Sequence, residues 1–177
     1  MDPNAPIALI GASYLDSDTA AHDFTSVWAA RNDGAFHHTS VAVLTKDCDG
    51  RLHVERYHST AKHLEWGGAL IGAALVVLAP TTGIQILAGV GWSGAGAMVG
   101  HFRQHAGPEE LAAIAGLLEA GASSLVAVVV NRQGRVMTPL LSHAEGCASV
   151  DMPWGDLEEE LSADFAHPTV ERALVAV

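Results

Sequence analysis

Hydrophobic and polar positions recur along this chain with two periods, and each period predicts a type of element. Short apolar or alternating runs bounded by turn residues are typical of strands, whereas apolar residues three and four positions apart indicate helices. The predicted strands are residues 7–14, 39–45, 51–58, 123–131 and 148–152. The predicted helices are residues 19–31, 108–120, 136–143 and 155–165.

Turn and capping residues mark the ends of several of these elements. Ser17 or Asp18 can cap the first helix, because a short polar side chain satisfies the free amides at a helix start. The Asp47-Cys48-Asp49-Gly50 sequence predicts a hairpin turn between two strands. Pro108 suits the first turn of a helix and would break any helix that reached it from the N-terminal side.

The order of the elements indicates a fold class. Without residues 62–103, the order is strand, helix, strand, strand, helix, strand, which is that of ferredoxin-like folds. We therefore predict an α+β protein: a ferredoxin-like βαββαβ antiparallel sheet with an inserted glycine-rich apolar helical hairpin. The predicted divisions are the core at 1–61 and 104–152, the hairpin insertion at 62–103, and an acidic C-terminal helix and tail at 153–177.

Residues 66–102, which we call the charge-free segment, contain no Asp, Glu, Lys or Arg and hold half of the 18 glycines. Two helical arms are predicted within it, at 66–79 and 82–102. Each arm is a marginal membrane span, because about 20 apolar residues are needed. Small residues four positions apart let helices approach closely, as in a glycine zipper. The residues expected at such a contact are Trp66, Gly68, Gly72, Gly89, Trp92, Ser93, Gly96 and Gly100.

Three environments could bury these two arms. They are the interior of a single fold, a lipid bilayer, and the same hairpin in further copies of the protein. A single copy of this size has little with which to cover two helices that are apolar all round. The segment lacks the flanking Lys and Arg cluster that membrane spans usually carry. We therefore favour a homo-oligomer slightly over membrane association.

Charge and length exclude some classes of function. The 177 residues include 20 acidic and 9 basic side chains, so the formal net charge is -11. This charge repels phosphate backbones, and we predict no nucleic-acid partner. The N-terminus lacks the pattern of a signal peptide, which predicts a cytoplasmic protein, either a soluble assembly or membrane-associated. Cys48 and Cys147 lie too far apart for a metal-binding motif.

Four stretches resemble the domain-of-unknown-function 1269 family, small bacterial and archaeal proteins often labelled predicted membrane proteins. They are the opening strand and helix, the Val41–Gly50 hairpin, the Trp66–Gly72 entry to the charge-free segment, and the Leu117–Leu125 approach to a valine-rich strand. The resemblance covers about residues 7–152. It implies a ferredoxin-like core with a hydrophobic helical insertion, and it supplies no catalytic residues.

Ten histidines make metal binding a candidate chemistry. His101 and His105 are four positions apart, so both lie on one face of a helix, the spacing of a two-histidine metal site. Glu109 continues this spacing, but Pro108 turns it away. His53, Glu55 and Tyr57 are expected on one face of a strand. No cofactor is predicted outright, and zinc or iron is the candidate ion.

These observations leave more than one class of function open. The leading hypothesis is a non-enzymatic protein that self-assembles through its glycine-rich hairpin, with possible membrane contact. The first alternative is a histidine-based metal-binding protein or metalloenzyme with its site at a subunit interface. The second is a binder of small apolar ligands, by analogy with paired ferredoxin-like sheets.

Overall fold

A computed structural model describes most of the chain and provides the architecture. The described residues are 6–32, 36, 38–49, 51–59, 70–78, 86–87, 95–130, 137–153 and 155. The expected C-terminal helix at 155–165 and the tail beyond it lie outside these residues, apart from residue 155.

The centre of the molecule is a six-stranded sheet with the order β4-β3-β2-β5-β1-β6. All neighbouring strands are antiparallel except β3 and β4, which are parallel. The strands are β1 (Pro6–Tyr14), β2 (His38–Lys46), β3 (Leu52–Ser59), β4 (Ile86–Leu87), β5 (Ser123–Val130) and β6 (Gly146–Pro153). The α+β class and the five long strands expected from the sequence are thus confirmed.

The ferredoxin-like strand order is wrong. In that fold the third strand lies between the first two, whereas here β5 takes the place between β1 and β2, and β3 lies outside β2. The different hydrophobicity of β5 and β3 explains why β5, and not β3, lies between β1 and β2. Every residue of β5 is buried, so this strand needs cover on both faces, while β3 carries several exposed side chains and suits an outer position.

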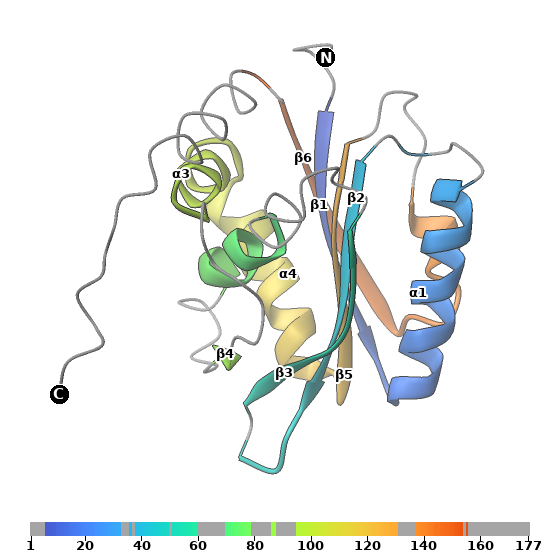
Figure 1. Ribbon diagram of the computed structural model, residues 1–177. Helices are drawn as coiled ribbons and strands as arrows, with labels where there is room; N and C mark the ends of the chain where they lie inside the picture. Colours follow the sequence, from blue (N-terminus) through green and yellow to red (C-terminus); the bar gives the residue numbers. More distant parts are fainter. Residues whose placement is uncertain are drawn as a thin grey trace, which may run out of the picture.

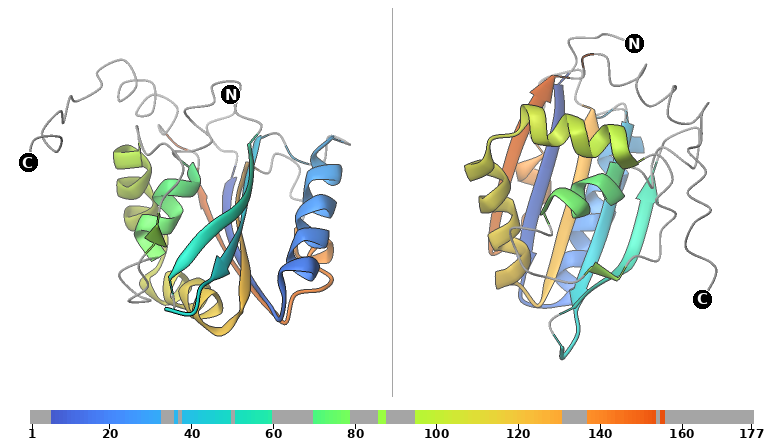
Figure 2. Two further views of the ribbon diagram at one scale, coloured as in Figure 1. Left: turned by 60° about the horizontal axis from the view of Figure 1, so that its bottom comes forward. Right: turned by 90° about the vertical axis from the view of Figure 1, so that its left-hand side faces the viewer.

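Helices cover both faces of the sheet (Figures 1 and 2). On one face lie α1 (Ser17–Asn32) and the single 3-10 turn η1 (Thr138–Leu140). On the other lie the helix 70–78, α3 (Ala95–His105) and α4 (Pro108–Ala120). Alternate residues of each central strand enter the two cores, for example Leu9 toward α4 and Ile10 toward α1.

Local sequence signals set several element boundaries. Pro108 is the first residue of α4 and separates it from α3, as predicted. The start of α1 is capped by Asp16, whose Oδ1 accepts the main-chain N–H of Thr19 at 2.8 Å, so the expected Ser17 or Asp18 cap is one or two positions late. The expected helix at 136–143 is wrong, because only the 3-10 turn η1 forms there.

A bulge in β3 changes which side chains share a face. The pairing with β2 shifts between Val43 and Leu44, which leaves Glu55 as an extra residue between two paired positions. Val54 and Tyr57 therefore both pack on the α4 side. His53 lies on the opposite face, so the expectation that it shares a face with Tyr57 is wrong.

The second of the two predicted arms is wrong. Residues 70–78, inside the first arm, are helical as expected, but Ile86 and Leu87, expected inside the second arm, form β4 beside β3. The helix 70–78 is covered by the protein's own sheet, and all its residues except Val76 are buried. Residues 70–78 therefore need no second copy and no lipid to leave water. No described helix combines the length and the apolar character needed to cross a membrane.

Candidate functional site

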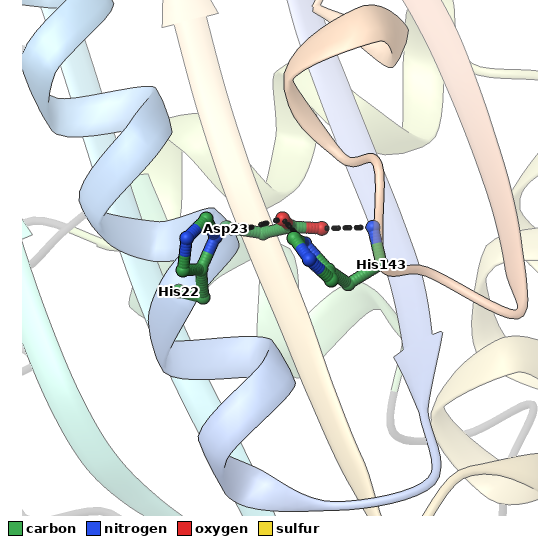
Figure 3. Close-up of side chains that lie close together, drawn as sticks. All are labelled: His22, Asp23 and His143. Atoms are coloured by element: carbon green, nitrogen blue, oxygen red, sulfur yellow. Dashed lines mark hydrogen bonds and ion pairs between the residues drawn. The ribbon is translucent and has the colours of Figure 1, made fainter.

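Four polar side chains meet on the α1 face, and Figure 3 shows three of them, His22, Asp23 and His143. His22 and Asp23 come from the second turn of α1, and Tyr14 is the last residue of β1. His143 lies on the connection between η1 and β6. We call His22, Asp23 and His143 the His–Asp–His cluster, with Tyr14 beneath it.

The carboxylate of Asp23 is the buried centre of this cluster, with a side-chain exposure of 0%. It lies on the inward face of α1, together with Ala20, Phe24 and Val27. Its two oxygens are within hydrogen-bonding distance of three groups. Oδ1 lies 2.7 Å from the Nδ1 of His143, and Oδ2 accepts the main-chain N–H of His143 at 3.0 Å and the Tyr14 hydroxyl at 3.2 Å.

The two imidazoles lie on the solvent side of the carboxylate. The His22 side chain is 66% exposed and that of His143 is 41% exposed. Their rings meet edge to face, with centroids 4.5 Å apart. His22 Nδ1 is 3.8 Å from Asp23 Oδ1, and one ligand atom from each of the three residues lies within 4.8 Å of the other two. The cluster thus forms a compact set of atoms that could ligate a metal, with one buried and two accessible members.

The hydrogen bond to Asp23 fixes the position of one proton on His143. A carboxylate only accepts, so the bonded Nδ1 carries a proton. This hydrogen bond orients the ring, and a metal ion held between Asp23 and His143 would have to replace the proton on Nδ1.

Tyr14 supports the cluster from the core. Burial raises the pKa of its phenol, and the negative charge of Asp23 and the hydrogen bond to it raise it further. The hydroxyl therefore stays protonated and donates to the carboxylate. A buried donor of this kind holds Asp23 in place without neutralising its charge.

The spacing of the donor atoms fits a small metal ion after a modest adjustment. Ligand atoms around a tetrahedral zinc, at bonds of about 2.0–2.1 Å, lie roughly 3.3 Å apart. The 2.7 Å contact between Asp23 and His143 would widen as the ion replaces the proton, and the 3.8 Å contact to His22 would shorten. His22 is mostly exposed, so a rotamer change can supply this movement.

The histidines proposed from sequence lie elsewhere. His101 and His105 lie side by side in α3, as their spacing predicted, with tilted rings whose centroids are 4.5 Å apart. His101 is buried, and its Nε2 lies 2.9 Å from the carbonyl oxygen of Pro153, so it links α3 to the end of β6. Within the described part of the chain, the metal-ligating group of three is the His–Asp–His cluster and does not include this pair.

The residues expected at an oligomer or membrane contact are only partly described. Gly72 is buried in the helix 70–78, Gly96 lies in α3, and Gly100 of α3 is exposed. The remaining five lie outside the described residues: Trp66, Gly68, Gly89, Trp92 and Ser93.

Sequence reasoning missed the His–Asp–His cluster because its members come from distant segments. Asp23 and His143 are 120 residues apart, and no motif spacing connects them. One local signal was present. Asp23 occupies a position on the apolar stripe of α1, between Ala20 and Phe24, where a carboxylate requires partners from another element.

Comparison with known proteins adds no family or relative. No family model, curated protein or solved structure matches this chain. The resemblance to the domain-of-unknown-function 1269 family therefore stays a prediction, and the site has to be interpreted from its own geometry.

Proposed function

We propose that this protein binds one divalent transition-metal ion of the zinc class through His22, Asp23 and His143. The observation that carries this proposal is the placement of a fully buried carboxylate directly beneath two exposed imidazoles, with all three donor groups within 4.8 Å. The metal-binding alternative from the sequence thus gains a specific site, on one chain and on the opposite face of the sheet from His101 and His105.

Charge is the physical reason to expect a cation here. A buried carboxylate is costly unless a positive charge or several donors compensate it. Its ion-pair partners within the described residues are the two imidazoles, which are positive only when protonated. A bound cation would supply that charge when both imidazoles are neutral.

The donor set selects the class of ion. Two imidazole nitrogens and one carboxylate oxygen suit Zn²⁺, Co²⁺ or Fe²⁺, whereas Mg²⁺ and Ca²⁺ prefer oxygen ligands throughout. Zinc or a related ion is therefore the proposed occupant.

The competing interpretation is a purely structural link. The hydrogen bonds of Asp23 also hold the connection that carries His143 onto α1, and this would stabilise the fold without any ion. The two interpretations differ in one measurable property, which is the affinity of the intact protein for a metal.

The test is a titration of the purified full-length protein with Zn²⁺ and Co²⁺, followed by calorimetry and by the visible spectrum of bound Co²⁺. We expect one high-affinity site. His22→Gln and His143→Gln should each weaken it by more than about tenfold, because each removes a ligand from a three-ligand site. His105→Gln is the matched control, since it removes an exposed histidine from α3 and should leave the affinity unchanged.

Folding is checked separately, because Asp23 is buried. His22 is mostly exposed, so His22→Gln should retain the circular dichroism and melting temperature of the wild type. Stoichiometric binding that survives in both His22→Gln and His143→Gln would place the ion elsewhere. An absence of binding in the wild type would leave only the structural link.

Self-assembly through the charge-free segment also stays a proposal. Fewer residues support it than the sequence suggested, because the helix 70–78 is already buried in its own subunit and offers little surface to a second copy. What remains is Gly100 on the exposed side of α3, where an added Cβ would meet nothing within 4 Å. A second copy could approach the backbone there.

A further inference from the structure

We infer that the ion bound by His22, Asp23 and His143 keeps one open coordination position on its solvent side and takes a small monodentate anion there. This inference rests on the proposed metal site and specifies what that site would bind in turn.

The number of donors is the first argument. Zinc-class ions in proteins usually take four ligands, and sites with three protein ligands keep the fourth for water or an exogenous ligand. Within the described part of the chain, the group of metal-ligating side chains has three members. A fourth ligand would then come from solution.

The distribution of burial places the open position. The inner side of the cluster is closed by Asp23 and by Tyr14, which is 1% exposed. The outer side is formed by the rings of His22 and His143, which are 66% and 41% exposed and lie on either side of the Asp23 carboxylate (Figure 3). An ion held among these three side chains is covered by protein on one side and reached by solvent on the other.

Charge selects the ligand. A divalent ion with one carboxylate and two neutral imidazoles has a net charge of about +1, so the open position favours an anion over a neutral molecule. The protein as a whole has a formal charge of -11, which opposes large polyanions. A small monodentate anion, such as a carboxylate or azide, satisfies both conditions.

The experiment uses Co²⁺-loaded full-length protein in a non-coordinating buffer, with sodium azide as the probe. Azide should shift the visible absorption bands of Co²⁺ and saturate at one azide per ion. Acetate should compete with it, because it would occupy the same position. The His105→Gln protein should respond like the wild type, since it keeps all three proposed ligands.

The outcomes separate this inference from the proposed function. Co²⁺ binding that depends on His22 and His143, with a spectrum unchanged by azide, would mean that the coordination shell is closed. That result would overturn the open position and leave the proposed metal site standing. A protein that binds no Co²⁺ would overturn the metal site itself. An azide response that persists in the His143→Gln protein would assign the open position to another ion and would also overturn the inference.

Discussion

Gly11 of β1 lies directly against Ile114 of α4, and a Cβ added at Gly11 would come within 2.5 Å of Ile114 Cγ2. The glycine is therefore what lets this helix pack closely on the centre of the sheet. Ile114 is fully buried, so it has no room to move away.

We expect Gly11→Ala to lower the free energy of unfolding by about 1–3 kcal/mol, because the methyl group overpacks the interface between β1 and α4. The matched control is Gly116→Ala in the same helix, where a Cβ would meet nothing within 4 Å. That substitution should raise stability by roughly 0.5–1 kcal/mol through helix propensity. Urea unfolding of both variants measures the difference, and equal effects would contradict the close packing.

Removal of two buried hydroxyls is predicted to affect stability differently, because one has a hydrogen-bond partner and the other has none within the described residues. The Tyr14 hydroxyl donates to the buried carboxylate of Asp23, so Tyr14→Phe should cost about 1–3 kcal/mol. Ser124 Oγ is buried and has no hydrogen-bond partner within the described part of the chain. Ser124→Ala should therefore be neutral or stabilising.

Thermal unfolding at neutral pH measures both changes. A loss of stability in Ser124→Ala comparable to that in Tyr14→Phe would mean that the Ser124 hydroxyl is bonded after all. Far-UV circular dichroism confirms that each variant keeps its secondary structure before its melting temperature is compared.

The elements of this fold are largely predictable from hydrophobic periodicity, but the order of its strands is not. Alternation assigns each strand its two faces and gives no information about its neighbours. The contrast between the continuously apolar β5 and the polar β3 does indicate which of them is central, and it points away from a ferredoxin-like order. The bulge at Glu55 cannot be predicted from the alternation of polar and apolar residues. One extra residue moves every following side chain of the strand to the other face.

The candidate site and the cover of the charge-free segment are not predictable from sequence, for two different physical reasons. The His–Asp–His cluster depends on a contact between Asp23 and a loop residue, His143, and such long-range contacts leave no local spacing. The apolar character of the charge-free segment predicts two helices that one subunit cannot cover. The sheet has a second apolar face, with residues such as Leu9 and Val128, and this face covers the helix 70–78.

The turn between β2 and β3 should contribute a pH-dependent part of the stability. Hydrogen bonds hold the pKa of Asp47 below its usual range, first that with His53 and then those with the main-chain N–H groups of Arg51 and Asp49. His53 Nε2 lies 2.8 Å from Asp47 Oδ2. A lowered pKa in the folded state stabilises the protein above the ordinary pKa of an aspartate, and this contribution is lost as the pH falls through the lower, folded value.

We therefore expect the stability of Asp47→Asn to fall less steeply than that of the wild type as the pH drops below the ordinary pKa of an aspartate, about 3.9, because the variant has no proton to take up at this position. Urea midpoints measured at successive pH values give the slope. Asp49→Asn is the control, because Asp49 is largely exposed and its ion pair with Arg51 is long, at 3.7 Å. The turn would have no such role if both variants kept the acid slope of the wild type.

Self-assembly, if it involves the charge-free segment, should depend on the exposed side of α3. Gly100 is exposed, and an added Cβ there would meet nothing within 4 Å, so Gly100→Leu should leave the monomer fold and its melting temperature intact. The larger side chain would hold a second helix away from the backbone. We expect the mass measured by light scattering to fall relative to the wild type.

Gly72→Leu provides the contrast, because Gly72 lies in a helix packed into the subunit's own core. Overpacking there should lower the melting temperature whatever the assembly state, by an amount equivalent to about 1–3 kcal/mol. A wild-type protein that is monomeric in plain buffer would contradict self-assembly outright. An unchanged mass in Gly100→Leu would move the contact between copies away from this side of α3.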